Sequence, residues 1–163
     1  MGASSSLLTN VELDIYLSYP DNKTEYINKL MDILQTMNFK IMDSSIMIQS
    51  RKDLSHFEIS SYMEMFIDKT KFIFVCISSK TIKSVTQIME INEILDKYPI
   101  VQSKIIYFMM DECYTPITNT ELKSIIKKNI WYPIYDEDSL FTTTNKLLTL
   151  LMNQSASSSD YSI

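Results

Sequence analysis

The feature that most constrains the fold is a continuous apolar run at residues 72–77, followed by a polar turn and then by a helical pattern. A short run of this kind is expected where both faces of a parallel sheet are covered. The helix opens with a capping box, in which Ser84 accepts from the amide of Gln87 and the Gln87 side chain reaches back to Ser84. The stretch therefore predicts a buried strand, a polar turn and a capped helix.

Apolar residues along this helix recur at helical spacing and predict an inward-facing stripe. They are Ile88, Ile91 and Leu95, with Ile94 beside them. Glu90 lies off that stripe in the second turn, where it can face the end of the sheet. Two interpretations are open for this carboxylate: it is a functional group at the end of the sheet, or it is a solvated residue on the outer side of the helix.

Strands and helices alternate along the chain. Besides residues 72–77, apolar runs predict strands at residues 11–19, 39–42, 104–110 and 130–135. Helical spacing predicts further helices that begin near residues 24, 55, 121 and 136. The alternation predicts an α/β, flavodoxin-like, three-layer fold with a five-stranded parallel sheet in the order 2-1-3-4-5, and Pro133 assigns the last strand to an edge.

Three further features add detail to this pattern. Ser55 and Glu58 have the spacing of a second capping box. The apolar side of the last helix is predicted at Leu140, Phe141, Leu147, Leu148 and Leu151. The longest connection is at residues 43–54, and connections of this length in compact domains are usually functional or mobile.

The predicted strand order also predicts where a ligand would bind. In a sheet of order 2-1-3-4-5, the switch point lies between the first and third strands, and ligands bind beyond the carboxyl ends of those strands. Ser18 and Tyr19 end the first strand, and Ser78 follows the third. These residues are therefore expected at one site, with Glu90 on the helix that leaves it.

Length and composition exclude several classes of protein. A chain of 163 residues fits one domain, predicted at residues 11–152, with disordered polar tails at 1–10 and 153–163. The net charge of −5 argues against a nucleic-acid partner, and no apolar run approaches the roughly 18 residues of a membrane span. The two cysteines lack the spacing of a metal site, so no metal is expected. The single histidine, His56, is predicted to be a surface residue or a residue of a first helical turn, so no histidine-dependent triad is expected.

The only glycine of the chain has an informative position. It is Gly2, in the sequence Met-Gly-Ala-Ser-Ser-Ser, which matches the pattern for N-myristoylation in a eukaryote or in an organism that infects one. The alternative is an arbitrary tail of small residues. One myristoyl chain binds a membrane weakly and reversibly, so stable attachment would need a partner. We therefore expect a cytoplasmic protein, located at the cytoplasmic face of a membrane if Gly2 is modified.

Several motifs, taken in order, resemble those of a TIR (Toll/interleukin-1 receptor) domain. Residues 14–19 resemble the opening motif of the family, which has an aspartate, alternating apolar residues, a serine and an aromatic residue. Asp43 resembles the aspartate before the long BB loop of the family. Ser78, Ser84 and Glu90 resemble its serine, serine and glutamate in matching register. The resemblance implies the TIR fold.

The resemblance covers residues 12–152 and includes some departures from the family pattern. The family often has tryptophan and cysteine where this chain has Thr86 and Gln87. The predicted BB loop lacks the usual glycine and proline. These departures bear on ligand stacking and on the shape of the loop more than on the fold.

One function that the resemblance implies is enzymatic. Many TIR domains cleave NAD+ at the nicotinamide–ribose bond, and the glutamate at the position of Glu90 is essential in those enzymes. A fixed carboxylate suits this chemistry because bond cleavage builds positive charge on the ribose. NAD+ would be the substrate, without a cofactor. The expected substrate-binding residues are Ser18, Tyr19, Asp43, Ser78, Ser84 and Thr86.

The other implied function is that of a non-catalytic, membrane-tethered adaptor in innate-immune signalling. Adaptor TIR domains bind other TIR domains through the BB loop, here represented by Ile46, Met47, Ile48 and Arg51. The apolar residues of this loop are either exposed contact residues or residues that pack back onto the sheet. The two functions overlap, because catalytic TIR domains usually assemble to be active. A phospho-acceptor receiver domain is set aside, because no aspartate ends the third strand.

Overall fold

A computed structural model describes most of the predicted domain. The described residues are 13–20, 24–43, 55–81, 84–111, 128 and 131–160, with their side chains except at 56, 57, 59, 60, 62, 86, 98 and 154–160. The strands are β1 (Ile15–Ser18), β2 (Ile41–Asp43), β3 (Phe72–Ile77), β4 (Ile105–Met109) and β5 (Trp131–Pro133). The helices are α2 (Glu25–Thr36), α4 (His56–Lys69), α5 (Val85–Asp96), α6 (Tyr98–Val101) and α8 (Glu137–Asp160), with a 3-10 turn, η2, at Gln102–Lys104.

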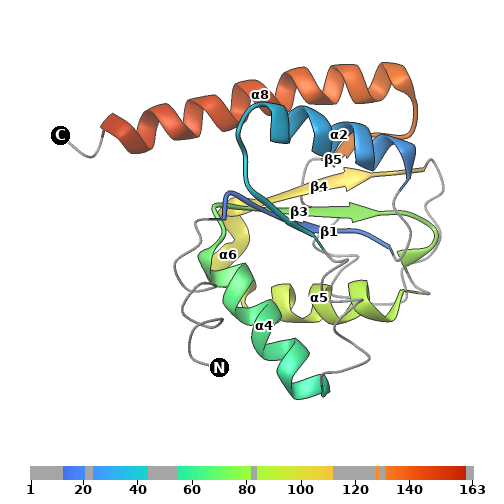
Figure 1. The fold of residues 1–163 in the computed structure, drawn as a ribbon, viewed down its shortest axis with the longest axis vertical. Helices are drawn as coiled ribbons and strands as arrows, with labels where there is room; N and C mark the ends of the chain where they lie inside the picture. Colours follow the sequence, from blue (N-terminus) through green and yellow to red (C-terminus); the bar gives the residue numbers. More distant parts are fainter. Residues whose placement is uncertain are drawn as a thin grey trace.

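The strands form one five-stranded sheet in the order β2-β1-β3-β4-β5, and every pairing is parallel. This arrangement confirms the predicted fold class and strand order. It also confirms that the strand containing Pro133 lies at an edge. Helices α2 and α8 cover one face of the sheet and α4 and α5 cover the other, which gives three layers (Figure 1).

Each face of the sheet has its own buried apolar cluster. The cluster under α2 and α8 contains Ile15 and Leu17 of β1, and the cluster under α4 and α5 contains Tyr16. Successive side chains of a strand point to opposite faces, so β1 contributes to both clusters. All six residues of β3 are buried, as the continuous apolar run predicts. The domain thus has two cores, one on each face of the sheet.

Two helix caps form where the sequence predicts them, and a third begins a helix whose cap was not predicted. The Ser55 hydroxyl accepts from the amide of Glu58 at 3.2 Å, and the Ser84 hydroxyl accepts from the amide of Gln87 at 3.2 Å. The Thr24 hydroxyl accepts from the amide of Ile27 at 3.3 Å and begins α2. Each bond satisfies one of the amides that the first helical turn leaves without a partner.

The predicted inward stripe of α5 is wrong at one position. Ile88 is 39% exposed, whereas Gln87, Glu90, Ile91 and Ile94 are buried. A helix advances about 100° per residue, so a buried face centred on residues 87, 91 and 94 includes residue 90 and turns residue 88 outward. The predicted stripe had the right spacing but the wrong rotation about the helix axis.

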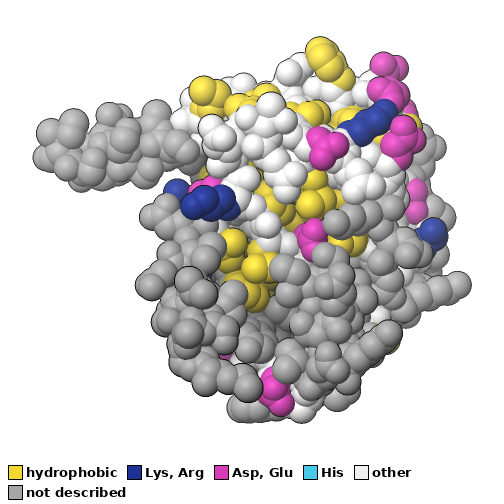
Figure 2. Space-filling model, viewed as in Figure 1, with side chains coloured by type: hydrophobic (Ala, Val, Ile, Leu, Met, Phe, Trp, Pro, Cys, Tyr) yellow, Lys and Arg dark blue, Asp and Glu magenta, His cyan; other side chains and the backbone are white. Residues whose placement is uncertain are grey.

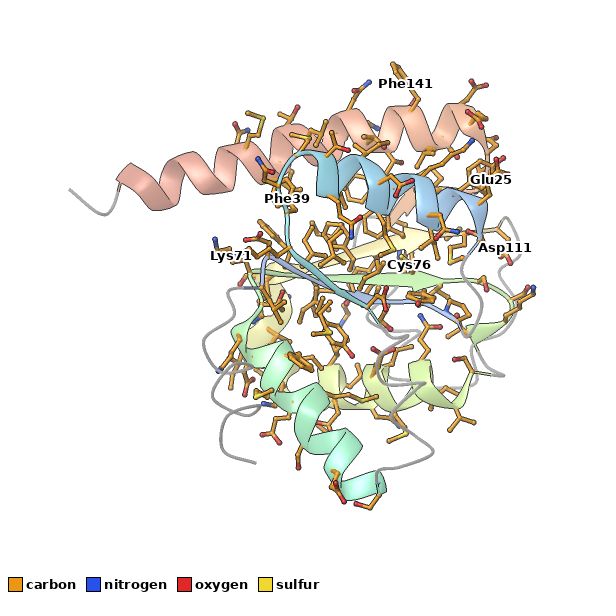
Figure 3. All side chains as sticks on the ribbon, viewed as in Figure 1. Glu25, Phe39, Lys71, Cys76, Asp111 and Phe141 are labelled. Carbon is orange, nitrogen blue, oxygen red and sulfur yellow. The ribbon has the colours of Figure 1, made fainter. Side chains whose placement is uncertain are left out.

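The same kind of error affects α8. Phe141, predicted on the apolar side, is 71% exposed and points away from the sheet, while Leu140, Leu147 and Leu151 are buried (Figure 3). Helix α8 also continues to Asp160, which differs from the disordered tail predicted from residue 153. The far end of α8 extends beyond the sheet (Figure 1).

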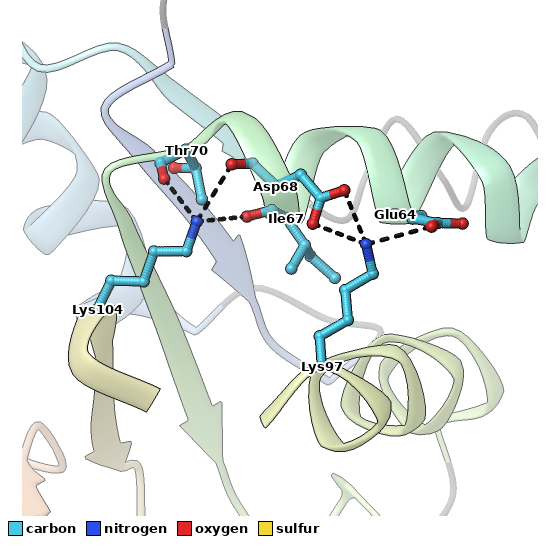
Figure 4. A network of polar contacts seen from close by, with 6 residues as sticks. All are labelled: Glu64, Ile67, Asp68, Thr70, Lys97 and Lys104. Carbon is cyan, nitrogen blue, oxygen red and sulfur yellow. Dashed lines mark hydrogen bonds and ion pairs between the residues drawn. The ribbon is translucent and has the colours of Figure 1, made fainter. Parts of the chain in front are cut away.

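Two lysines connect helices and loops near the amino-terminal ends of the strands (Figure 4). The Lys104 ammonium donates to the carbonyls of Ile67 at 2.7 Å, Asp68 at 3.3 Å and Thr70 at 2.9 Å. The Lys97 ammonium contacts both carboxylate oxygens of Asp68 at 2.7 Å and a carboxylate oxygen of Glu64 at 3.2 Å. Lys104 therefore caps the end of α4, and Lys97 links α4 to α5.

No helix within the described part of the chain is long and apolar enough to cross a membrane. The predicted helix near residue 121, the predicted interaction loop at Ile46, Met47, Ile48 and Arg51, and the predicted lipidation site at Gly2 lie outside the described residues.

Candidate functional site

The candidate site centres on Glu90, whose side chain is completely buried between α5 and β1. The Tyr16 hydroxyl donates a short hydrogen bond to Oε2 of Glu90, and the Ser18 hydroxyl donates to Oε1 at 3.1 Å. Both donors are also buried. The interpretation of Glu90 as a solvated helix residue is therefore wrong, and each of its carboxylate oxygens accepts a hydroxyl group.

The local sequence explains how these three side chains meet. Tyr16 and Ser18 are two residues apart in β1, so they point to the same face of the sheet. That face carries α5, and the buried side of α5 includes Glu90. β1 lies between β2 and β3 in the sheet, with Ser18 opposite Val75 of β3. The carboxylate is thus beside the carboxyl end of β1, at the predicted switch point.

Burial and charge change the acidity of two neighbouring groups. Burial, followed by the charge and the hydrogen bond of Glu90 and smaller contributions from Asp43 and Tyr19, raises the pKa of Tyr16 well above its ordinary value. Burial, and secondly the charge of Glu90, raises the pKa of the Cys76 thiol. Tyr16 is therefore a protonated hydrogen-bond donor at neutral pH, and Cys76, inside the central sheet (Figure 3), is an unreactive thiol.

Gln87, one turn before Glu90, forms a different contact from the predicted one. Its side-chain nitrogen donates to the carbonyl of Cys76 at 2.6 Å, so the predicted reach back to Ser84 is wrong. The Ser84 amide instead donates to the carbonyl of Thr81 at 3.1 Å. Gln87 lies on the buried side of α5, where a strand carbonyl is close and a buried acceptor gains from a donor. The contact fastens the first turn of α5 to β3.

The Gln87 amide is only half satisfied. Its oxygen is buried and accepts no hydrogen bond from the described part of the chain. The nitrogen must face the Cys76 carbonyl, because two acceptors would repel each other, and this fixes the direction of the oxygen. The start of α5 therefore holds a buried acceptor in the turn before Glu90.

The turn between β3 and α5 is built by its own polar groups. The Ser78 hydroxyl accepts from the amide of Lys80 at 3.0 Å, and the Ser78 amide donates to the hydroxyl of Thr81 at 3.0 Å. Ser79 donates through its amide at 2.9 Å and its hydroxyl at 3.0 Å to one carboxylate oxygen of Asp111, at the end of the sheet (Figure 3). Ser78 therefore shapes the turn, and Asp111 anchors it to the segment after β4.

Among the remaining predicted site residues, Asp43 and Tyr19 lie close enough to Tyr16 to contribute to its raised pKa. Tyr19 is buried in the cluster under α2 and α8, on the opposite face of the sheet. Asp43 ends β2 half-buried and pairs in register with Leu17, whose side chain belongs to that same cluster. Ser84 is buried and caps α5. The side chain of Thr86 lies outside the described residues. Of the predicted contacts, the structure brings Ser18 directly to Glu90.

Sequence reasoning missed Tyr16, the second hydroxyl donor to Glu90. The signal was present in the chain, because a tyrosine two residues before Ser18 in a strand must point to the same face as Ser18. Tyr16 was read as one apolar residue of an alternating strand. Its hydroxyl is also a hydrogen-bond donor, and the acceptor, Glu90 of α5, is known only from the structure.

A surface groove of about 560 Å³ lies between α2 and α8, on the face of the sheet opposite Glu90. It is lined by Lys29, Ile33, Glu137, Leu140, Phe141 and Thr144, among others. Lys29 contacts Glu25 at 3.1 Å and also pairs with Glu137, and acidic side chains flank a basic one on this side of the molecule (Figure 2). The groove is thus separate from the candidate site.

Within the described ranges, no three His, Cys, Asp or Glu side chains are grouped so that they could hold a metal ion.

Comparison with known proteins identifies the fold. No protein-family model matches the chain, and no curated protein sequence matches it. Among solved structures, the TIR domain of the Toll-related receptor TRR-2 from Hydra magnipapillata matches with a TM-score of 0.58 and 15% identity, over 86% of this chain and 98% of that one. The TIR domains of the activated Roq1 resistosome, which recognises the pathogen effector XopQ, match with a TM-score of 0.50 and 18% identity, over 85% of this chain and 83% of that one. The chain therefore has the fold of a TIR domain, as its motifs predicted.

Proposed function

We propose that the protein is a TIR-domain signalling protein that cleaves NAD+ at the nicotinamide–ribose bond when several copies assemble. The observation that supports this proposal is the Glu90 carboxylate, which is buried beside the carboxyl end of β1 and is oriented by two hydroxyl donors. Ligands of open parallel sheets bind at such strand ends. A carboxylate held in a fixed direction at this place is suited to a cationic transition state.

The proposed reaction uses the charge of Glu90. As the bond to nicotinamide breaks, its electron pair leaves with nicotinamide and positive charge develops on the ribose. The carboxylate stabilises that charge, and its burial makes the attraction stronger than it would be in water. Water then adds to the ribose and releases a proton, which gives ADP-ribose. NAD+ is the substrate, and the reaction requires no cofactor or metal.

Assembly is the second part of the proposal. The Roq1 structure is that of an activated resistosome, so TIR domains of this fold can function within an assembly that responds to a pathogen effector. We infer the same kind of partner here, namely other TIR domains, and a role in innate-immune signalling. The predicted contact loop is that of Ile46, Met47, Ile48 and Arg51.

The test compares two glutamates of the same helix. Purified protein, free or clustered on liposomes, is incubated with NAD+, and nicotinamide is measured by chromatography. We expect turnover by the clustered protein, and Glu90→Ala should lose about 100-fold or more, the range for a group that stabilises transition-state charge. Glu93→Ala, three residues along α5 and half-buried, is the matched control and should retain activity. No nicotinamide even from densely clustered protein would refute the enzymatic proposal.

A non-catalytic adaptor is the alternative, and one observation favours it. Both oxygens of Glu90 are already engaged by Tyr16 and Ser18, as expected for a carboxylate with a purely structural role. In that case the clustered protein produces no nicotinamide, yet it still recruits a second, differently labelled TIR domain to the liposomes. Recruitment together with turnover would instead support the enzyme.

Membrane attachment is a separate part of the proposal, and it depends on Gly2. A myristoylated protein would be cytoplasmic and located at the cytoplasmic face of a membrane. Co-expression with N-myristoyltransferase, followed by intact-mass measurement, should show the mass of one myristoyl group, and Gly2→Ala should abolish it. An unmodified Gly2 would remove the tether from the proposal.

A further inference from the structure

We propose that the structure shows the candidate site closed by the protein's own hydroxyl groups, with Ser18 in the place that a ligand hydroxyl takes and Tyr16 as the positioning donor that remains. This inference rests on the proposed function in that Glu90 is the ligand-binding carboxylate. It adds a residue that the sequence did not single out, Tyr16, and gives Ser18 a specific role. The ligand class is a vicinal diol such as ribose.

The geometry supports this assignment because the contacts match those of a diol. Glu90 accepts one hydroxyl on Oε2 and a second on Oε1, at 3.1 Å from the Ser18 oxygen. Two neighbouring hydroxyls of a sugar present the same pair of donors to one carboxylate. All three protein side chains are fully buried, so no carboxylate oxygen is accessible to a ligand unless a contact opens.

The positions of the two donors along β1 decide which of them gives way. Ser18 is the last residue of β1, nearest the strand ends where a ligand arrives. Tyr16 lies two residues deeper, and its ring belongs to the apolar cluster under α4 and α5. Moving the tyrosine would disrupt that packing, whereas a serine hydroxyl can turn by a single bond rotation. A ligand hydroxyl therefore replaces Ser18 while Tyr16 keeps the carboxylate aligned.

One neighbouring contact holds α5, the helix that carries Glu90, in place. Gln87 fastens the first turn of α5 to the Cys76 carbonyl and thereby fixes the helix from which Glu90 projects. A site that is open only part of the time binds its ligand more weakly by that fraction. The closed arrangement thus predicts weak binding by the isolated domain and tighter binding by any variant or assembly that disfavours the Ser18 contact.

The first experiment measures access to Glu90 and does not depend on catalysis. The folded protein is treated with a water-soluble carbodiimide and an amine, and the labelled carboxyl groups are located by mass spectrometry. We expect Glu90 to be protected in the wild type, while Glu25, with a side chain that is 69% exposed, is labelled. Ser18→Ala should increase labelling of Glu90 at least about tenfold, the lower end of the range for one hydrogen bond to a charged group. ADP-ribose should restore protection.

Controls separate this effect from a loss of folding. Ser61→Ala, on the exposed side of α4, makes the same chemical change away from the site and should leave Glu90 protected. Circular dichroism checks that each variant is folded, and Ser18→Gly is used if Ser18→Ala is not. Equal labelling of Glu90 in the folded Ser18 variant and the wild type would overturn the inference. So would labelling of wild-type Glu90 at the rate of Glu25.

The second experiment separates the roles of the two donors by kinetics. In the clustered protein, Ser18→Ala should lower KM for NAD+ about tenfold and leave kcat within a few fold, because its closed state is weaker. Tyr16→Phe should lower kcat about tenfold, because the carboxylate loses its alignment. A fall in kcat for Ser18→Ala with unchanged KM would contradict the assignment. If the clustered wild type releases no nicotinamide, the proposed reaction fails, and the labelling result still decides whether Ser18 closes the site.

Discussion

The hydroxyl of Tyr16 links the stability of the domain to pH. Burial first, and then the charge and hydrogen bond of Glu90, raise the pKa of Tyr16 above its ordinary value of 10.0. The folded protein therefore keeps a proton that the unfolded chain loses above about pH 10. The contribution of this group to stability is complete below that pH and decreases as the pH rises, by at most about 1.4 kcal/mol per pH unit.

Replacing the tyrosine should remove this dependence. We expect the free energy of unfolding of Tyr16→Phe to fall less steeply than that of the wild type between about pH 9 and about pH 11. Urea unfolding followed by circular dichroism measures both slopes. Tyr132→Phe, on the edge strand β5, is the control for losing a phenol elsewhere in the sheet. Equal slopes for Tyr16→Phe and the wild type would show that Tyr16 ionises alike in both states.

Single residues also show which hydrogen bonds can be predicted from the sequence. Ser84 was predicted as a helix cap and is one, because a cap depends on residues three positions apart. Gln87 was predicted to complete that cap, but its partner is the carbonyl of Cys76, eleven positions away on another element. The burial of Glu90 has the same cause, because its partners lie more than seventy positions earlier in the chain. Local spacing predicts local hydrogen bonds and carries no information about these distant ones.

Among the elements, helix α4 depends on two lysines whose partners differ in kind. Lys104 donates to three carbonyls where α4 ends, and the last carbonyls of a helix have no partner inside the helix. Lys97 joins carboxylates that are half or more exposed. Partly buried hydrogen bonds from a charged donor stabilise more than exposed ion pairs do, so the two lysines are not equivalent.

Matched substitutions test this difference. Lys104→Met should lower the free energy of unfolding by about 2 kcal/mol, and Lys97→Met by about 1 kcal/mol or less. The effect of Lys97→Met should shrink at high salt, because salt screens exposed charges, while that of Lys104→Met should change little. Urea unfolding at low and high salt measures both effects. Equal losses, or a salt-independent effect of Lys97→Met, would contradict this account.

At the level of elements, spacing predicted where helices form but not how they are rotated. In α5, residues 88, 91 and 95 and residues 87, 91 and 94 both satisfy helical spacing, and the structure buries the second set. The second set contains polar Gln87, which hydropathy alone places outside. The polar side chain is accepted inside because Cys76 offers it a hydrogen bond. Helix α8 is likewise rotated about its axis so that Leu140 faces the core, and the next residue, Phe141, is exposed.

For the whole molecule, α8 contributes to the core through only part of its length. Leu140, Leu147 and Leu151 are buried, whereas Met152 is 61% exposed and Asn153 is exposed. The end of the helix extends beyond the sheet (Figure 1). The stability of the domain should therefore depend on residues up to Leu151 and not on those after Asn153.

Two truncations test this boundary. A chain that ends after Asn153 should keep its melting temperature within about 3 °C, a change worth less than about 1 kcal/mol. A chain that ends after Lys146 loses Leu147 and Leu151, and each buried leucine removed costs about 2–5 kcal/mol. We expect that chain to be largely unfolded, since domains are stable by about 5–15 kcal/mol. Differential scanning calorimetry measures the melting temperature of both chains. If the chain that ends after Asn153 is strongly destabilised, part of the core lies after Asn153.

The sequence alone determined the order of strands and helices, the parallel sheet, the edge position of β5 and the caps of the helices. Each of these follows from residues close together in the chain, or from the small number of ways in which alternating strands and helices can pack. Only the tertiary structure decided which side of each helix faces the sheet and which side chains meet beside the end of β1. Tyr16, Ser18 and Glu90 are brought together by packing α5 against β1, and that contact depends on the shape of the whole core.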